Sequence, residues 1–315
     1  MNQADRTDQA DQVDYPNHSN HGNQGKPRLL PRRHPWRVVS AGLALLVLAM
    51  LVISVGTNRN MHWEVVRTFL FDVQILEGLR NTILLTLICM VLAMVIGVVT
   101  AIMQLSENAV LSTLARLYVW FFRGVPLLVQ LIFWFNLALL WPRMGLIVPG
   151  FGINFSVSTN TLINSFLASV IGLTLHEAAY MAEIVRSGLL SVDRGQTEAA
   201  RSLGMKEPSV LFRIVLPQAM RMIVPPTGNQ FVSLLKSTSL VAFIAGGDLM
   251  TMVQSIYSQN FMVVPLLVVA SIWYLCITTV AGAFQGYLER HLAGAFRREK
   301  ASTRWAAGFA SKDGA

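Results

Sequence analysis

The feature that most constrains this chain is a set of apolar runs, each near 20 residues long or longer. A run of that length, folded as a helix, crosses the ~30 Å hydrocarbon core of a bilayer. The runs occupy residues 38–56, 81–103, 117–141, 162–190, 222–245 and 262–284. They predict an all-α integral membrane protein with six spans, because a helix satisfies its own backbone hydrogen bonds in lipid.

The distribution of basic residues predicts the orientation of these spans. An even number of spans places both ends of the chain, and 19 of its 25 Lys and Arg residues, on one side of the membrane. The other side receives Arg59, Arg67 and Arg143. Cytoplasmic loops carry an excess of Lys and Arg, so both termini are expected in the cytoplasm. The net charge of +8 is then a topology signal, and no nucleic-acid partner is expected.

The two ends of the chain differ from its apolar centre. Residues 1–37 have few large apolar side chains and are expected to form a disordered cytoplasmic tail. Residues 38–56 are expected to be an N-terminal transmembrane anchor; the alternative, a cleaved signal peptide, would need a cleavage site of small residues that the run lacks. Residues 293–315 are expected to form a basic cytoplasmic tail.

Motifs for catalysis or metal binding are missing from the sequence. In the segment HEAAY, residues 176–180, Tyr180 stands where a zinc protease has its second His. The chain has no G-x-x-x-x-G-K-[ST] phosphate loop, and Cys89 and Cys276 show neither disulfide nor zinc spacing. We therefore expect no enzymatic activity, metal or cofactor in this chain.

A charged segment between two apolar runs, EAARSLGMKEPSVLFRIVLP at residues 198–217, predicts two short helices with a break. Asp193 suits the cap of the first helix, and Gly204 suits the left-handed residue that ends it. Pro208 suits the first turn of the second helix, and Pro217 disfavours helical geometry at the residue before it.

The side chains of this segment suggest a protein contact. Ala199, Ala200 and Leu203 form a small apolar face that fits a groove of another protein. Glu198 and Arg201 lie one helical turn apart and can pair with each other or with a partner. The alternative is an ordinary cytoplasmic helix–turn–helix loop.

The spacing of this segment resembles the EAA loop of ATP-binding-cassette importer permeases. The matching positions are Glu198, Ala199, Ala200, Gly204, Ile214, Leu216 and Pro217. In that family the loop is a coupling helix that docks into a cleft on the ATPase subunit. The resemblance implies that residues 191–217 are the coupling loop and that ATP is bound by a partner subunit.

Four further stretches resemble the polar-amino-acid uptake branch of that family, whose permeases serve amino acids such as histidine, glutamate, glutamine and arginine. They are FRGVPLLVQL (122–131), EAAYMAEIVRSGL (177–189), PPTGNQF (225–231) and KSTSL (236–240). The likeness covers residues 76–292 and implies five core helices, with 38–56 as an extra one. Val125 departs from the pattern, which commonly has Thr there.

The resemblance also implies a setting. It is a multi-pass permease of a bacterial inner membrane that carries a small polar amino acid. Its partners are ATPase subunits, a periplasmic or lipid-anchored solute-binding protein, and a second permease chain, identical or related. The alternative is a stand-alone secondary transporter, which needs its own coupling-ion site and no docking helix.

Ionisable residues inside membrane spans are costly, so each is a candidate for function. Arg123, with Gly124 and Pro126, is assigned a structural or gating role, although Arg123 can also snorkel to the interface. The predicted fifth span contains Pro225 and Pro226 and is expected to be irregular.

Polar residues of the fourth and fifth spans are candidates for the substrate path. They are Glu177, Asn229, Gln230, Lys236, Ser237 and Thr238. Glu177 suits the ammonium of a zwitterionic amino acid, and Lys236 suits its carboxylate. The alternatives are helix packing through small polar residues and a structural Lys236–Glu177 ion pair.

Overall fold

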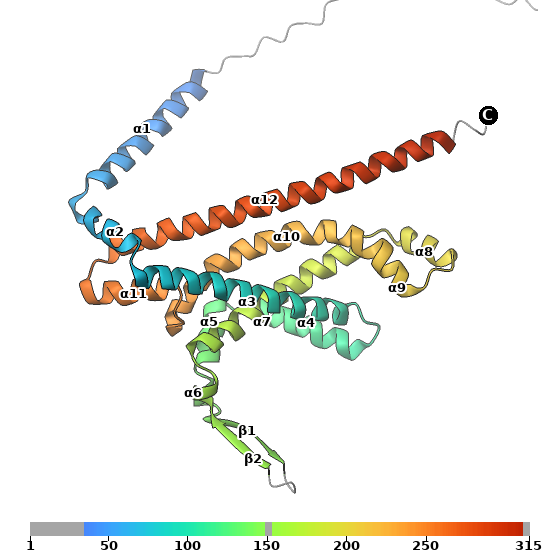
Figure 1. The fold of residues 1–315 in the computed structure, drawn as a ribbon, viewed down its shortest axis with the longest axis horizontal. Coiled ribbons are helices and arrows are strands. Elements are labelled where there is room, and N and C mark those ends of the chain that lie inside the picture. Colours follow the sequence, from blue (N-terminus) through green and yellow to red (C-terminus); the bar gives the residue numbers. More distant parts are fainter. Residues whose placement is uncertain (1–34, 149–152, 311–315) are drawn as a thin grey trace, which may run out of the picture. The chain divides into compact units, whose positions relative to one another are not determined.

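The computed structural model describes residues 35–148 and 153–310, drawn as coloured ribbon in Figure 1. The helices are α1 (Pro35–Thr57), α2 (Trp63–Leu70), α3 (Val73–Gln104), α4 (Ala109–Gly124), α5 (Leu127–Phe135), α6 (Thr159–Leu162), α7 (Ser165–Leu190), α8 (Arg194–Ser202), α9 (Glu207–Val210), α10 (Leu216–Ser237), α11 (Leu249–Asn260) and α12 (Val263–Ala310). Three short 3-10 turns are η1 (Arg59–Met61), η2 (Leu137–Leu139) and η4 (Thr238–Ile244), and η3 (Leu211–Val215) is a π-helical turn.

The chain divides into two compact units, residues 1–58 and 59–315. In the first unit the described element is α1, an apolar helix that covers the predicted anchor. The predicted disordered tail lies almost entirely outside the described residues. The second unit holds all the other elements.

Among the described residues, three helices are long and apolar enough to cross a membrane, within Val39–Thr57, Val73–Gln104 and Val263–His291. Two bent helix pairs raise the number to as many as five. The predicted count of six is therefore not confirmed. The remaining predicted span, 162–190, is helix α7, which has the necessary length at 26 residues. Its polar and charged residues lower its mean hydropathy, so it does not stand out as an apolar span.

The third predicted span is two helices rather than one. Helices α4 and α5 meet at an angle of 101°. Pro126, the residue before α5, has no N–H to continue the hydrogen-bond ladder, and Val125 before it is extended. The Gln130 side chain donates to the carbonyl oxygens of Phe122 (3.0 Å) and Val125 (2.9 Å), so it satisfies acceptors that the break leaves free.

The fifth predicted span is less irregular than expected. Helix α10 continues unbroken through Pro225 and Pro226, and the irregular part begins only at η4. Prolines are tolerated inside membrane helices where neighbouring groups satisfy the freed carbonyls. The Thr227 hydroxyl donates to the carbonyl of Ile223 at 2.8 Å, next to the proline pair.

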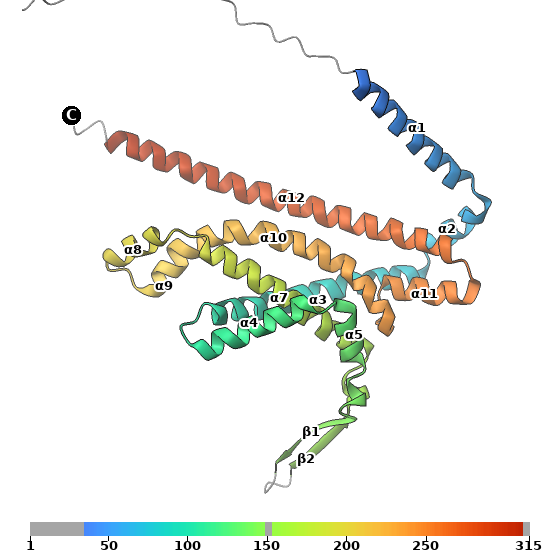
Figure 2. The ribbon, with the colours of Figure 1, turned by 180° about the vertical axis from the view of Figure 1, so that it is seen from behind.

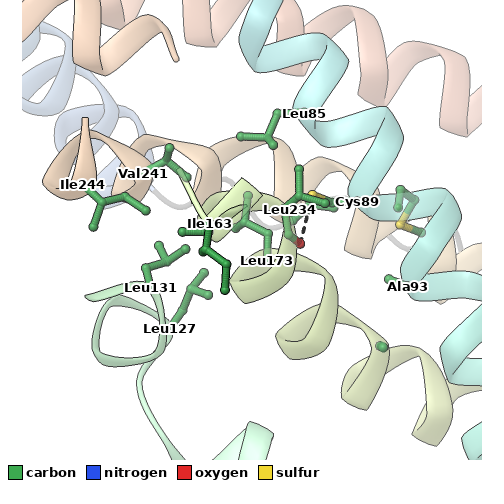
Figure 3. Close-up of a cluster of buried hydrophobic side chains, with 14 of the residues drawn as sticks. Leu85, Cys89, Ala93, Leu127, Leu131, Ile163, Leu173, Leu234, Val241 and Ile244 are labelled. Carbon is green, nitrogen blue, oxygen red and sulfur yellow. Dashed lines mark hydrogen bonds between the residues drawn. The ribbon is translucent and has the colours of Figure 1, made fainter. Parts of the chain in front are cut away.

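The main core lies where α3 packs along α7, with α5, α10 and η4 closing its sides (Figure 3). Leu85 and Cys89 of α3, Leu131 of α5, Leu173 of α7 and Leu234 of α10 are all buried there. The two long helices approach closely, because a Cβ at Gly97 would lie 2.6 Å from the Cβ of Met181. A second apolar cluster joins α2, the start of α3, α11 and α12.

Helices α8 and α9 lie at the opposite end of the α7–α10 pair from α11, as both ribbon views show (Figures 1 and 2). Strands β1 (Arg143–Val148) and β2 (Ile153–Ser158) pair antiparallel, with Arg143 opposite Ser158. They connect α5 with α7. The charged segment therefore sits at one end of the helices that carry the predicted substrate path.

Candidate functional site

The predicted coupling loop folds as two short helices held by local interactions. Asp193 caps α8, and its carboxylate accepts the N–H of Gly195 at 2.6 Å. The helix ends in a Schellman motif: the N–H of Met205 donates to the carbonyl of Ala200 and the N–H of Gly204 to that of Arg201. Gly204 has the expected left-handed geometry, with φ of +75°. The cap and the break predicted here are confirmed.

Arg201 pairs across the break rather than with Glu198. Its Nε lies 2.7 Å from Oε1 of Glu207, and its Nη2 lies 3.1 Å from Oε2. This two-point ion pair holds α9 against the end of α8 and lowers the pKa of the exposed Glu207 carboxyl. Glu198 keeps its carboxylate exposed, without an ion pair in the described part of the chain.

The connection to the membrane also differs from the expectation. Leu216 was expected to leave helical geometry before Pro217, but its φ of −61° and ψ of −44° are helical. The preceding residues, η3, form a π-turn, in which each N–H bonds five residues back instead of four. The wider turn changes the backbone hydrogen bonds beside Pro217, whose ring would otherwise clash with the carbonyl four residues earlier. The chain therefore enters α10 without a break. Ile214 lies in the π-turn and is half-buried.

The residues of the coupling pattern divide into two groups. Glu198, Ala199 and Gly204 are exposed, and Leu203 beside them is 83% exposed. Ala200 is 3% exposed and packs inside the segment, since successive helix residues face different sides. The surface that the segment offers to a partner thus consists of an acidic side chain, small residues and one large apolar side chain.

Helix α10 carries a polar stripe, defined here as Pro226, Asn229, Ser233 and Lys236. These residues are three or four positions apart, share one helix face, and are exposed. In a lipid-facing helix such a face would be apolar. A stripe of this kind indicates a face that lines a cavity or contacts another protein.

The lower cavity, as we call the hollow at the Pro226 end of this stripe, has a volume of about 590 Å³. Pro226, Asn229 and Gln230 of α10 form one wall, and Arg123, Tyr180 and Glu183 face them. Pro226 has no N–H, so the carbonyl of Met222, also in the lining, loses its helical donor. The cavity therefore presents charged groups, amide groups and a carbonyl without its usual helical donor.

Arg123 of the predicted gating group lies against α7. Its guanidinium carbon is 5.1 Å from the centre of the Tyr180 ring, and its Nη1 is 4.0 Å from Oε2 of Glu183. Glu183 also forms the predicted local pair with Arg186, at 2.8 Å. Gly124 ends α4 and Pro126 precedes α5, so these two residues mark the bend, while Arg123 contacts α7 beside it.

Glu177 lies deeper in α7, with 3% of its surface exposed. The side chain of Gln230, which lines the lower cavity, lies beside its carboxyl group. The Oε1 atom of Glu177 has no hydrogen-bond partner among the described residues. A buried acceptor without a partner is unusual and calls for an explanation.

Lys236 lies at the upper end of the stripe, in a separate cavity of about 270 Å³, here the upper cavity. Its polar lining includes Ser239, Ser271 and Tyr274. Within the described residues Lys236 forms no ion pair, with Glu177 or any other acid. Ser237 ends α10 half-buried, and Thr238 is buried, its hydroxyl donating to the carbonyl of Leu235. The structure thus separates the two predicted charged path residues.

Two residues behind the cavities escaped the sequence analysis. Asp248, 1% exposed, caps α11 and lies 3.4 Å from the hydroxyl of Tyr274. Its position after two glycines and before an apolar run was an available capping signal. Gln130 also contacts Nδ1 of His176 at 3.1 Å, but these residues lie 46 positions apart and no local pattern links them.

Apolar helices long enough to cross a membrane, joined to an exposed helical segment, are the arrangement expected of the transmembrane subunit of a transporter. Residues 93–294 match the family described as "Binding-protein-dependent transport system inner membrane component". The chain belongs to this family, and it is accordingly a multi-pass membrane protein.

Individual relatives and a solved structure support this family assignment. The chain is 45% identical over 276 residues to the arginine transport system permease protein ArgU of Corynebacterium glutamicum, covering 87% of this chain and 84% of that protein. It is 33% identical to the probable glutamine ABC transporter permease protein GlnM of Bacillus subtilis, over 69% and 92%. A crystal structure of an amino acid ABC transporter with histidines matches with a TM-score of 0.58 and 32% identity, over 69% and 94%.

Proposed function

We propose that this chain is the permease subunit of an ATP-driven importer that carries polar amino acids across a bacterial inner membrane. One observation carries the proposal. The coupling segment, as we call residues 191–217, is joined through η3 to α10, the helix with the polar stripe, without a break in the helical backbone. A partner that moves the coupling segment thereby acts on the helix that lines two polar cavities. The related permeases named above, for arginine and for glutamine, support amino acids as the substrate class.

The working assembly consists of two permease chains, two ATPase subunits and an external solute-binding protein. ATP binds to the ATPases, and Glu198, Ala199, Ala200, Gly204, Ile214, Leu216 and Pro217 belong to the segment that couples to them. Transport proceeds by alternating access, in which ATP and the loaded binding protein both favour the outward-facing form. The stand-alone secondary transporter is disfavoured, because the family is one of binding-protein-dependent systems.

Substrate moves along the polar stripe of α10. Lys236 supports this path because an exposed ammonium at membrane depth, with no acid beside it, requires a water-filled cavity or a partner. Glu177 supports it from behind Gln230, where its free oxygen can accept a hydrogen bond. Asn229, Ser237 and Thr238 complete the path, and Arg123, Gly124 and Pro126 control the bend at its lower end.

Both termini lie in the cytoplasm, on the side of the ATPases. The basic residues of the core and C-terminal region hold this orientation without the first span. A C-terminal reporter enzyme should therefore remain cytoplasmic when residues 1–56 are deleted. A reporter that appears on the periplasmic side would contradict this orientation.

Reconstitution tests the function as a whole. The permease is co-expressed with a cognate ATPase and binding protein, purified and placed in proteoliposomes. Uptake of labelled basic and amide amino acids should require internal ATP and the external binding protein. Uptake by the permease alone, driven by an ion gradient, would replace the proposal with a secondary transporter.

A further inference from the structure

A further cavity in the described part of the chain lies outside the polar stripe. It is an apolar groove of about 750 Å³, bounded by α3, α7, α10, α12 and the π-turn η3. Pockets that hold one small molecule commonly measure about 300–1,000 Å³. The volume therefore suits a molecular occupant.

The apolar groove follows the membrane direction. On α3 its lining residues are Leu87, Met90, Met94, Val98 and Ile102, which recur every three or four positions. Leu87 and Ile102 are 15 residues apart, so the groove is about 22 Å long at the helical rise. This is shorter than the ~30 Å that a spanning helix must cross. Because α3 and α12 are long and apolar enough to cross a membrane, the groove lies at the depth of the lipid tails.

Polar groups in the lining gather at one end of the groove. Gln285 and Glu289 of α12 line the end nearest the coupling segment, together with Leu211 and Leu216. Gln285 donates to Oε1 of Glu289 at 2.9 Å. Two exposed guanidinium groups, Arg213 and Arg290, directly follow the lining residues Phe212 and Glu289 in sequence. This end therefore presents a carboxylate, with two arginines one position outside the lining, and apart from Thr227 the side chains of the remaining lining are apolar.

We propose that the apolar groove binds one acyl chain of a zwitterionic phospholipid from the leaflet next to the coupling segment. The acyl chain packs along α3 and α10. The headgroup phosphate is held by Arg213 and Arg290, since guanidinium is a strong phosphate partner, and the headgroup ammonium is held by Glu289. Because Leu211, Phe212 and Leu216 belong to the junction between coupling segment and α10, the lipid sits at the joint that transmits movement.

Two matched pairs of variants test the site in the full-length chain. Ala281→Trp and Val98→Trp place a ring in the groove from opposite walls. Val280→Trp and Val99→Trp place the same ring one position away, on faces that are 66% and 53% exposed and outside the lining. Membrane abundance of all four is compared with the wild type, so that a failure to fold is recognised separately.

The probe is phosphatidylethanolamine with a photoreactive acyl chain, added to purified protein in nanodiscs. We expect one labelled lipid per chain, with cross-links on α3, α10 and α12. Each buried methylene contributes about fourfold in affinity, so displacing two should reduce labelling about tenfold or more in the groove variants. The adjacent controls should label as the wild type does.

Several outcomes would overturn the proposal. They are equal labelling in the groove and control variants, cross-links confined to other surfaces, or a photoreactive residue at position 94 that captures protein instead of lipid. The headgroup assignment is tested by Glu289→Gln, which should remove a preference for phosphatidylethanolamine over phosphatidylglycerol. A wild type that prefers phosphatidylglycerol would refute the role of Glu289.

Discussion

Residues 193–217 and the middle of α7 both carry charged side chains, but their surroundings differ. In the coupling segment, the Asp193 carboxylate, the last carbonyls of α8 and the Arg201 side chain all find partners within six residues. In the membrane region, Glu177, Thr174 and Gln130 each keep a buried polar atom without a hydrogen-bond partner among the described residues.

The difference shows in which part of the molecule the polar groups are satisfied without a partner or ligand. Local caps and an ion pair preform the coupling segment, so a partner meets a surface already in its binding shape. Unsatisfied buried polar atoms cost free energy and persist where another group completes them in some state of the protein. We therefore expect surface variants of the coupling segment to act on docking, and α7–α10 variants to act on transport.

The largest effect is expected for Glu198→Lys. If Glu198 faces a basic group of the ATPase, a lysine there places two like charges together. Such a pair costs several kcal/mol, which corresponds to a loss of association of about 100-fold or more. ATPase co-purification and uptake should both fall to background while membrane abundance stays normal. Gln196→Lys, exposed on the same helix but outside the pattern, is the control. Full ATPase recovery and uptake in Glu198→Lys would show that Glu198 is not part of the docking surface.

A smaller but selective effect is expected for Lys236→Met and Glu177→Gln. Loss of one hydrogen bond to a charged group costs about 1.5–3 kcal/mol, so uptake should fall about tenfold or more. Abundance and ATPase binding should be unchanged, because Lys236 is exposed and the glutamine keeps the shape of Glu177. Lys236→Arg, which retains the charge, is the control.

Two other results would contradict that path assignment. Unchanged uptake in both single variants would remove the two residues from the path. Low abundance in each single variant, restored in the double variant, would instead indicate an ion pair between them in another state of the protein.

Gly204→Ala should loosen the coupling segment without clashing with it. A Cβ at this position has no heavy atom within 4 Å, so the cost comes from the φ of +75°. Left-handed geometry costs an alanine about 1–2 kcal/mol. Amide hydrogen exchange in α8 and α9 should rise several-fold, and ATPase binding should weaken moderately. Ser202→Ala is the control; equal exchange in both variants would mean that the Schellman turn does not order the segment.

The smallest effect is expected from the Arg201–Glu207 pair, whose side chains are exposed to solvent. Because Arg201 lowers the pKa of Glu207 in the folded segment, the pair stabilises it above the ordinary glutamate pKa of 4.5. That contribution is lost as the pH falls through the lowered pKa. Amide exchange in α9 should therefore become less sensitive to pH in this acidic range in Glu207→Gln. The exchanged pair, Arg201→Glu with Glu207→Arg, should recover the sensitivity.

The sequence predicted best those features that depend on neighbouring residues. Asp193, Gly204 and the Glu183–Arg186 pair follow from capping geometry and helical spacing, and the structure confirms them. The helical Leu216 was missed because Pro217 normally disfavours helix before it, and the π-turn that accommodates it has no sequence signal.

Features that depend on distant residues escaped prediction. The unbroken course of α10 depends on its packing against α7 and α12, which no local pattern reports. The Asn81 side chain donates to the carbonyl of Gly247, 166 positions away, and fixes the turn before α11. The opposite charges of Glu177 and Lys236 suggested a pair. The two residues are separated because of which face of α10 packs against α7, and the sequence does not reveal that face.

The π-turn η3 has a consequence for how this family can change over evolution. A π-turn is an α-helix with one residue inserted, and each residue of an α-helix turns the chain by about 100°. Removing one residue from Leu211–Val215 would leave α10 seated in the membrane and swing α8 and α9 about a third of a circle around its axis. The direction in which the coupling segment faces, relative to the polar stripe of α10, therefore depends on a single residue. Insertions and deletions should be rarer here than in the loop that joins β1 to β2, where no such angle has to be kept.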